Sequence, residues 1–372
     1  MRRSSKQVSE SNRGCNPRRY EINPKIVLTL ENQTIGELLA RKAEDTPPPA
    51  QRALRRAARR AFLWEIEAAE LARMGATLTE LNGVGPYIEK LIRQWLDAPP
   101  SKVQPVPLRA GFLTLCQARR ILAKKPAWLK SVKGDLQMHT TWSDGEGTIE
   151  EMSAAAVERN YEYIAITDHT KGLKIAGGIN EEQVEQQGRE IAVINERGRI
   201  AVLRSVEMNL NPRGKGDMDS GCLRKLDLVL GCFHSSLRKS DDQTERYVAA
   251  LRNPDIQILG HPRGRIYNFR SGLNADWEKV FGVAAELDKA VEIDGYPDRQ
   301  DLNVELLRLA KKAGCKISLG TDSHGPSQLR FMEFSAAAAL AASIKPECIL
   351  NFMTKTALLD WVDDVRRKGG QR

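Results

Sequence analysis

Short apolar runs alternate with amphipathic stretches through the last two thirds of the chain. Apolar runs of roughly four to eight residues bounded by turn residues are typical of strands. Seven such runs predict strands at Asp135–Met138, Tyr163–Thr167, Ile200–Val206, Leu226–Phe233, Ile256–Gly260, Ala290–Ile293 and Lys316–Gly320. Helical spacing predicts helices between most of them, at Thr148–Arg159, Glu181–Arg197, Asp242–Arg252, Trp277–Glu286 and Val304–Ala313. Repeated strand–helix units of this kind predict an α/β fold with a parallel sheet, closed or doubly wound.

The first third of the chain has a helical pattern throughout. One apolar face predicts one or two helices between Ala50 and Met74, and its residues are Leu54, Ala57, Ala58, Ala61 and Phe62. Thr34 with Glu37 fits a capping box that would start an earlier helix, as Thr148 with Glu151 does in the body.

A tight turn, Gly83-Val84-Gly85, follows and leads into a helix with Pro86 at its first position. Glycines let a backbone approach closely, and the N–H groups at a helix start can hold a phosphate without reading a base. The turn therefore favours non-specific contact with a phosphate backbone, while a simple packing corner between two helices is the alternative.

These patterns divide the chain into four parts. Residues 1–25 are polar and Arg-rich and are predicted to be a disordered basic tail. Residues 26–100 form a helical domain, and residues 101–133 form a linker with one helix. Residues 134–372 form the α/β body.

The net charge of +9 is unevenly distributed. Residues 1–133 hold 25 basic and 12 acidic side chains, whereas the remainder holds 32 basic and 36 acidic side chains. The basic excess therefore belongs to the helical third, and it indicates either a polyanion-binding module or a solvated helical face.

Several classes of protein are not expected from this sequence. The six cysteines are scattered and form no C-x-x-C pair, so neither a disulfide framework nor a zinc knuckle is expected. No apolar run is long enough for a membrane span, and the first residues lack the apolar core of a secretory signal. A cytoplasmic protein with no membrane partner is expected.

The strongest chemical pattern is the placement of histidines. Each of the five lies just after a predicted strand: His139, His169, His234, His261 and His324. Carboxylates are interleaved with them at Asp144, Glu207 and Asp322. Because chemistry in parallel α/β folds lies at the carboxyl ends of the strands, these side chains are expected to converge there. Mixed imidazole and carboxylate ligands suit Zn²⁺, Mn²⁺ or Fe²⁺, so a site for two or three divalent metal ions is predicted.

The ordered motifs resemble those of the PHP (polymerase and histidinol phosphatase) family. They are Asp135-Leu136-Gln137-Met138-His139, Ser143-Asp144-Gly145, Ile166-Thr167-Asp168-His169, Glu207, His234, Gly260-His261-Pro262 and Asp322-Ser323-His324. The resemblance implies a distorted seven-stranded (β/α) barrel that holds metals and hydrolyses phosphoesters.

The resemblance also implies a ligand set for each of three ions. One ion would be held by Gln137, His139, Glu207 and Asp322. A second would share Glu207 and add His234 and His261. A third would use Asp144, His169 and His324. The family's first motif usually has histidine where this chain has Gln137, which offers only a neutral carbonyl oxygen.

The helical third resembles a helix-hairpin-helix module. DNA contact through that module is predicted for Gly83, Val84, Gly85, Tyr87 and Lys90. A helix-hairpin-helix module followed by a PHP domain resembles the order in bacterial family X DNA polymerases. The roughly 30 residues between the two are too few for a polymerase palm of ordinary domain size, so polymerase activity is not expected.

Basic side chains near the histidines are candidate phosphate ligands. Arg263 and Arg265 follow His261 directly, and a pair of guanidinium groups can hold a phosphate bidentately. Ordinary surface salt bridges are the alternative for these two arginines. Lys171, two residues after His169, and Arg299 are weaker candidates.

Three hypotheses of function follow. The first is a metal-dependent hydrolase of DNA phosphoesters, either a 3′-5′ exonuclease or a 3′-end processing enzyme in DNA repair. The second is a small-molecule phosphomonoesterase of the histidinol-phosphatase type. The third is a non-catalytic DNA-binding protein with a degenerate metal site.

Overall fold

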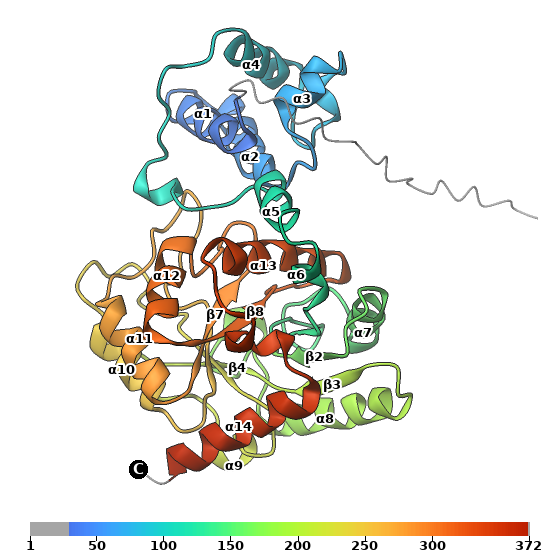
Figure 1. Cartoon of the computed structure of the whole chain (residues 1–372), viewed down its shortest axis with the longest axis vertical. Helices are drawn as coiled ribbons and strands as arrows, with labels where there is room; N and C mark the ends of the chain where they lie inside the picture. Colours follow the sequence, from blue (N-terminus) through green and yellow to red (C-terminus); the bar gives the residue numbers. More distant parts are fainter. Residues whose placement is uncertain (1–29, 371–372) are drawn as a thin grey trace, which may run out of the picture.

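The computed structural model describes residues 30–370, which form a helical N-terminal part and a larger α/β body (Figure 1). The predicted disordered tail at residues 1–25 and Cys15 lie outside the described residues. Within the described residues all five cysteines are free, as the sequence predicts. No helix among residues 30–370 has the length and hydropathy needed to cross a membrane.

The N-terminal part is built around its own apolar core. Its elements are α1 (Asn32–Glu44), α2 (Ala50–Arg60), η1 (Ala61–Leu63), α3 (Ala68–Arg73), η2 (Leu78–Glu80) and α4 (Pro86–Asp97). The apolar face predicted for the second helix lies inside this core or just beyond it, with Leu54, Ala57 and Ala61 fully buried. The region between residues 50 and 74 is therefore two α-helices joined by a short 3₁₀ turn.

The capping box predicted at Thr34 and Glu37 is wrong. Helix α1 begins at Asn32, so both residues lie inside it. The side chain of Asn32 is buried and exchanges hydrogen bonds with α3 and its entry, through Ile66 O at 2.9 Å and Ala68 N at 2.8 Å. These long-range bonds set the start of the helix, which local spacing cannot reveal.

The segment predicted as a linker with one helix has more structure than expected. It contains η3 (Pro107–Arg109), α5 (Leu115–Leu122) and α6 (Ala127–Lys130). A Thr114–Gln117 capping box starts α5. Leu115, Ala118 and Trp128 belong to the core of the body, and Trp128 donates a hydrogen bond to Ala336 O. This segment therefore packs as part of the body.

The body contains two parallel sheets. The first has the order β1-β2-β3 and the second the order β4-β5-β6-β7-β8. The strands are β1 (Gly134–Asp135), β2 (Tyr163–Ile166), β3 (Ala201–Arg204), β4 (Glu207–Asn209), β5 (Leu230–Cys232), β6 (Ile258–Leu259), β7 (Ala290–Asp294) and β8 (Lys316–Gly320). The parallel α/β class is as the sequence predicts.

The predicted count of seven strands is corrected to eight. The run Ile200–Val206 was expected to be one strand leading to Glu207, but the chain leaves the first sheet after Arg204 and enters the second at Glu207. Single isolated bridges span the two gaps between the sheets, Met138 to Ser323 and His169 to Glu207. The described residues therefore form two sheets joined by local bridges, without a continuous ladder around the body.

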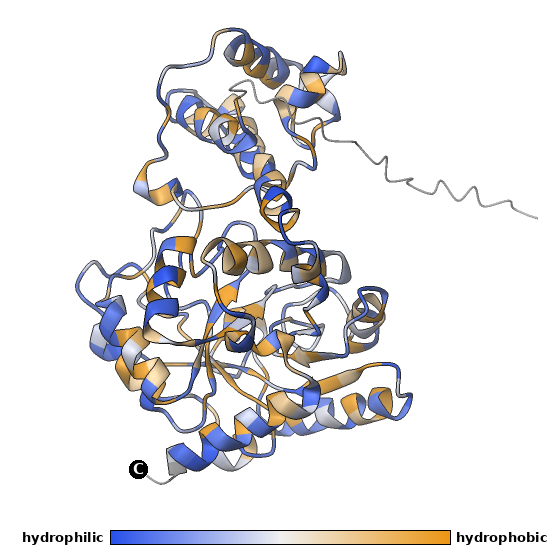
Figure 2. Ribbon diagram, viewed as in Figure 1, coloured by the Kyte–Doolittle hydropathy of each residue, from blue (hydrophilic) through white to orange (hydrophobic). Residues whose placement is uncertain are grey.

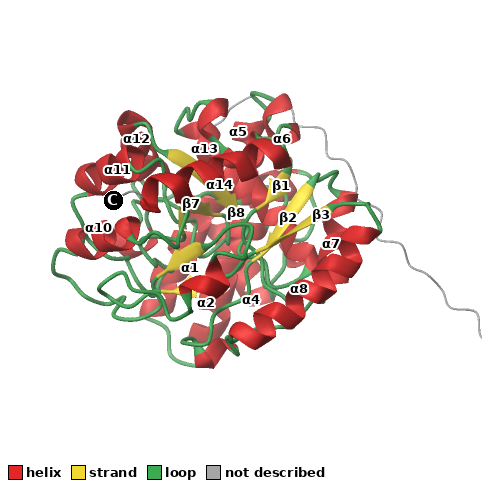
Figure 3. Ribbon diagram, turned by 90° about the horizontal axis from the view of Figure 1, so that it is seen from below, coloured by secondary structure: helices red, strands yellow, loops and turns green. Residues whose placement is uncertain are grey.

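Helices surround the strands on the outside of the body (Figure 3). They are α7 (Ile149–Glu158), η4 (Lys174–Ala176), α8 (Glu181–Glu196), α9 (Ser220–Leu223), α10 (Thr244–Arg252), α11 (Trp277–Glu286), α12 (Val304–Ala313), η5 (Pro326–Phe331), α13 (Met332–Ala341), η6 (Pro346–Cys348), η7 (Leu350–Phe352) and α14 (Lys355–Gly370). The predicted Thr148–Glu151 capping box starts α7. Hydrophobic colours gather on the central strands, while α8 and α14 carry both colours (Figure 2).

The helical part docks onto one face of the body. Its contacts reach the loops that follow β6 and β8: Phe62 packs on Tyr267, and Glu65 pairs with Arg330. Since these loops follow the carboxyl ends of parallel strands, the N-terminal part covers the face at which catalytic sites of such folds lie.

Candidate metal centre

The carboxyl ends of the strands bring the predicted histidines and carboxylates together. His139 follows the bridge at Met138, and His169 itself bridges to Glu207, the first residue of β4. The remaining predicted ligands follow other strand ends in the same way, with Asp144, His234, His261, Asp322 and His324 all after a strand. All nine predicted ligand positions, Gln137 included, therefore lie at one end of the body.

The first group surrounds His139. Its Nε2 lies 2.9 Å from Asp322 Oδ1 and 3.2 Å from Glu207 Oε2. Gln137 donates a hydrogen bond from Nε2 to Glu207 Oε2 at 2.9 Å. All four side chains are buried, so their oxygen and nitrogen atoms lie close together and away from bulk water.

The second group shares Glu207. Its Oε1 lies 2.7 Å from His234 Nε2 and 2.8 Å from His261 Nε2. The contact with His234 lacks the alignment of a hydrogen bond, and His234 Nε2 has no hydrogen-bond partner. Cys232 also offers its sulfur close to Glu207 and His261, a neighbour that sequence reasoning missed.

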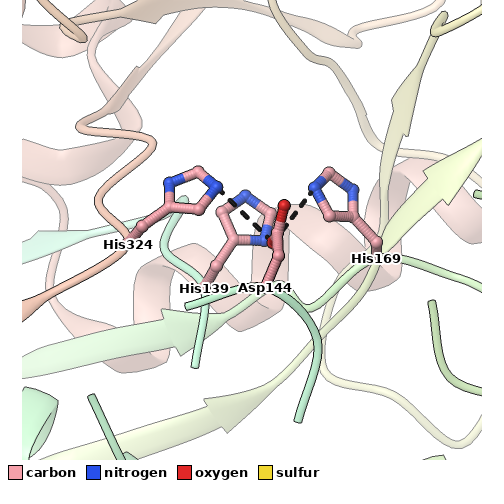
Figure 4. Close-up of side chains that lie close together, drawn as sticks. All are labelled: His139, Asp144, His169 and His324. Carbon is pink, nitrogen blue, oxygen red and sulfur yellow. Dashed lines mark ion pairs between the residues drawn. The ribbon is translucent and has the colours of Figure 1, made fainter. Parts of the chain in front are cut away.

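The third group includes Asp144, His169 and His324 beside His139 (Figure 4). Asp144 Oδ1 lies 3.6 Å from His169 Nε2 and 3.5 Å from His324 Nε2. The His139 ring stacks on the His169 ring with centroids 4.3 Å apart. Asp144 and His324 are the more accessible members, so this group faces the opening of the centre.

The electrostatics of the cluster keep its carboxylates ionised. Burial alone would raise the pKa of Glu207, but His169, His261 and His234 together hold it well below its ordinary value. Burial likewise acts to raise the pKa of Asp322, and Arg299 and His139 outweigh it, so this pKa is also lowered. Burial lowers the pKa of His169 to about 3. Burial also acts to lower the pKa of His139 and of His261, but Asp322 and Glu207 raise that of His139 and Glu207 raises that of His261. Ionised carboxylates and neutral imidazoles are the forms that bind cations, so a metal ion would take the place of the proton on these two rings.

Buried polar atoms without a hydrogen-bond partner indicate whether the cluster fits metal ions. Buried polar atoms normally have hydrogen-bond partners, because an unsatisfied one costs about 1–3 kcal/mol. Several in this cluster have none: Gln137 Oε1, His139 Nδ1, His169 Nδ1 and His234 Nε2. Four sets of three or four candidate ligand atoms lie within 4.8 Å of one another. This donor set fits divalent cations of the zinc or manganese type.

Surrounding side chains orient the candidate ligands. Asn209 Oδ1 lies 3.2 Å from His234 Nδ1, and the carbonyl of Asp322 lies 2.8 Å from His324 Nδ1. Asp168 accepts hydrogen bonds from the loop that carries Asp144, including 2.8 Å from Thr140 N. Sequence reasoning missed Asn209, which is the last residue of β4 and has no metal-binding motif around it.

The basic residues predicted to bind phosphate do not all lie at the metal cluster. Arg265 is buried, donates to the carbonyls of Arg299 and Gly111, and stacks over Phe112 with its guanidinium 3.6 Å from the ring centroid. Its guanidinium therefore secures the segment before α5, and a phosphate clamp through Arg265 is not supported.

Arg263 and Lys171 also have other partners. Arg263 donates to Ser271 O at 2.7 Å, and Lys171 pairs with Glu181 at 2.5 Å. Arg299 is the basic side chain in contact with the cluster, since its Nη1 lies 2.7 Å from Asp322 Oδ2 and its side chain is 31% exposed. The sequence pattern favours Arg263 and Arg265, which directly follow the His261 motif, over Lys171 and Arg299.

The hairpin residues lie in the helical part. Gly83 has a φ of +86° in the turn between η2 and α4, and Gly85 is the N-cap of α4 with Pro86 at its first position. Val84 is buried, whereas Tyr87 and Lys90 are exposed on the first turns of α4. The element before the turn is a single 3₁₀ turn where a short helix was expected.

Comparison with known proteins gives three findings. The family model described as PHP domain matches residues 135–322. The DNA polymerase/3′-5′ exonuclease PolX of Bacillus subtilis is 36% identical over 225 residues, which cover 60% of this chain and 40% of that protein. A probable phosphatase of Thermoanaerobacter sp. (strain X514) is 30% identical over 230 residues, which cover 58% of this chain and 89% of that protein.

Among solved structures, one similar chain is the histidinol phosphate phosphatase of Lactococcus lactis complexed with zinc, L-histidinol and phosphate. It is 18% identical, with a TM-score of 0.39, over 64% of this chain and 94% of that chain. This likeness is too low to carry an argument.

Proposed function

We propose that DNA is the substrate of this chain, which belongs to the PHP domain family and is a hydrolase of phosphoester bonds. It removes nucleotides from, or processes, the 3′ end of a strand. The observation that carries this proposal is the docking of an arginine-rich helical part onto the face of the body that holds the metal centre. The name of the Bacillus subtilis relative, a DNA polymerase/3′-5′ exonuclease, supports the same substrate class. The aligned segment spans 40% of that relative.

The nine residues at the strand ends would hold two or three divalent ions of manganese or zinc. The first set is Gln137, His139, Glu207 and Asp322, the second is Glu207, His234 and His261, and the third is Asp144, His169 and His324. Such ions supply Lewis acidity to phosphoryl oxygens and activate water for attack on phosphorus. Glu207 is the residue common to two sets, because its two oxygens face different histidines.

The chain itself binds and orients the substrate phosphate. Arg299 is held between Asp322, at 2.7 Å, and Asp294, at 4.0 Å, and it can donate to a phosphoryl oxygen placed at the cluster. Burial of the first two ligand groups excludes bulk water, which strengthens the interaction between the charged side chains and a phosphate. Asn209 keeps the His234 ring in one orientation.

The hairpin turn would contact the sugar-phosphate backbone further along the strand. Gly83 and Gly85 place backbone N–H groups at the start of α4, and the exposed Tyr87 and Lys90 lie beside them. Contacts of this type position a strand without reading its sequence, which suits an end-processing enzyme.

An assay with two substrates tests this proposal. Metal-stripped protein supplied with Mn²⁺ would be offered a 5′-labelled oligonucleotide, single- and double-stranded, beside p-nitrophenyl phosphate. A ladder of products shortened from the 3′ end, absent in His169→Ala, is expected. Turnover of p-nitrophenyl phosphate with no shortening of either oligonucleotide would reject DNA as the substrate.

A small phosphomonoester is the second candidate. It is favoured by the probable phosphatase of Thermoanaerobacter, of which this chain covers 89%. In that case the helical part would serve only as a packing domain, and oligonucleotide binding would be absent at all salt concentrations. A non-catalytic protein with a degenerate metal site is not favoured, because Gln137 contacts Glu207 within the cluster and the other eight predicted ligands are present.

A further inference from the structure

The joint between the helical part and the body is fixed by buried contacts. Arg109 donates to both oxygens of Glu37 in α1 and to Asn268 of the body at 2.9 Å. Phe62, Phe112 and Tyr267 pack edge to face, with centroids 4.7 to 6.2 Å apart. A space between the two parts is therefore preformed, because these contacts leave α2 little freedom to move over the body.

Such a space exists next to the metal centre. A cavity of about 250 Å³ is lined from the helical part by Arg59, Arg60 and Leu63, and from the body by Tyr296, Asp298 and Phe331. Its volume is below the roughly 300–1,000 Å³ of sites for drug-sized molecules, so it suits a single small group. The lining combines two guanidinium groups with aromatic rings.

The cavity connects the hairpin turn to the metal centre. On one side, Arg60 packs beneath the turn, since a Cβ on Gly83 would lie 3.0 Å from Arg60 Cδ. On the other side, the Tyr296 ring lies edge-on to the His324 ring with centroids 6.2 Å apart. Arg299, three residues after Tyr296, reaches the cluster through Asp322. Hairpin turn, cavity and metal centre therefore follow one another along the joint.

Arg59 and Arg60 make no ion pair within 4 Å among residues 30–370, and neither do Arg55 and Arg56 of the same helix, but only Arg59 and Arg60 line the cavity. Asp298 is the acidic residue of the lining, where burial raises the pKa of its carboxyl and Arg59 acts against that rise. Two guanidinium groups beside one carboxyl leave a net positive charge in a preformed cavity, which favours an anion from outside.

We propose that this cavity binds the sugar-phosphate of the nucleotide next to the scissile phosphate of a single DNA strand. Arg59 and Arg60 hold that phosphate, and Tyr296 contacts the neighbouring sugar or base. This assignment rests on the proposed function, because a polynucleotide has a second phosphate next to the scissile one, whereas a phosphomonoester has none. A phosphomonoester occupies the metal centre without reaching the cavity.

The test compares two double variants of the same helix. Arg59→Gln with Arg60→Gln removes both charges and keeps the first carbons of the Arg60 side chain, which packs beneath Gly83. Arg55→Gln with Arg56→Gln removes the same charge from exposed positions of α2 that do not line the cavity. The KM for a 5′-labelled single-stranded oligonucleotide, measured with Mn²⁺ at several salt concentrations, is the readout.

We expect the KM of the cavity variant to rise by roughly tenfold or more, because one or two phosphates are no longer neutralised. The KM of the control variant should rise by about twofold at most. The salt slope of the cavity variant decreases by about 0.7 for each phosphate that the protein no longer neutralises. An equal rise in both variants would show diffuse attraction and overturn the cavity assignment while the proposed function stands. Failure of the unmodified protein to shorten the oligonucleotide overturns both.

A second variant tests the cavity without changing charge. Leu63→Trp places a large ring into the space, and it carries the test if the double arginine variant does not fold. We expect the KM for the oligonucleotide to rise by a larger factor than the KM for p-nitrophenyl phosphate. Equal factors for the two substrates would overturn the assignment.

Discussion

The side-chain amide of Gln137 donates a hydrogen bond to Glu207 across 2.9 Å, and its carbonyl oxygen has no partner. Glu207 is also the carboxylate closest to His234 and His261. The residue that departs from the usual family motif is therefore tied to the carboxylate shared by two of the proposed ligand sets. Because an amide oxygen is a weak neutral ligand, the first proposed ion would be held mainly by His139, Glu207 and Asp322.

Gln137→His is expected to increase the affinity of metal-stripped protein for Zn²⁺ by roughly tenfold or more, the scale on which residues at a metal site alter affinity. An imidazole nitrogen is a stronger ligand for zinc than an amide oxygen. Isothermal titration calorimetry would measure the affinity and the number of ions bound, with Gln137→Ala as the control. Identical titrations for all three proteins would exclude position 137 from the centre.

Asn209→Leu is expected to weaken metal binding and hydrolysis of a phosphoester by roughly 10–100-fold, because it removes the acceptor that lies 3.2 Å from His234 Nδ1. His234→Ala should have a larger effect, since it removes the proposed ligand itself. Asn209→Asp keeps an acceptor oxygen and should recover most of the loss. Metal content by mass spectrometry and kcat would be measured together, and an unaltered Asn209→Leu protein would contradict the orienting role.

Sequence patterning was sufficient to predict the elements on which the centre is built. The strand Lys316–Gly320 and the helices Trp277–Glu286 and Val304–Ala313 have the predicted bounds. A buried parallel strand is a continuous apolar run, and the polar residue that ends it can be recognised from the sequence alone. This is why the histidines could be assigned to a common face before the structure was known.

Contacts between distant loops could not be predicted in this way. Arg265 and Arg299 both follow strands, and the sequence favours Arg265 as the phosphate ligand, yet Arg265 holds the segment before α5 and Arg299 reaches Asp322. The position of the helical part depends on Arg109, which bonds residues 72 and 159 positions away. Hydrophobic periodicity carries no information about such pairs, because each is decided by the path of loops.

Arg109→Leu should destabilise the protein by about 3–5 kcal/mol, because it leaves the buried carboxylate of Glu37 without its bidentate partner. Arg41→Leu is a matched control, since Arg41 pairs with the same carboxylate at 2.8 Å but is 43% exposed. That variant should lose less than about 1 kcal/mol. Urea denaturation would provide both free energies of unfolding, and similar losses in the two variants would contradict the role of Arg109 in the joint.

Lys289 should make stability depend on pH in the alkaline range. Burial lowers the pKa of this lysine to about 7 from its ordinary value of 10.5. Between these two values the unfolded chain binds a proton that the folded protein does not bind, so the free energy of unfolding rises with pH across this window. In this window the free energy of unfolding rises by about 1.4 kcal/mol per pH unit. Below pH 7 and above pH 10.5 the contribution of Lys289 does not change with pH.

Two variants isolate this contribution from other titrating groups. Lys289→Met has no charge at any pH, so the stability of the unmodified protein should rise relative to it from about pH 7 to pH 10.5. Lys289→Arg keeps its charge throughout, so it should also lose the slope but be less stable than Lys289→Met at about pH 9, because a charge remains buried. Urea denaturation at half-unit pH intervals would measure these differences. Parallel curves for the unmodified protein and Lys289→Met would show that the pKa of Lys289 is not lowered in the folded state.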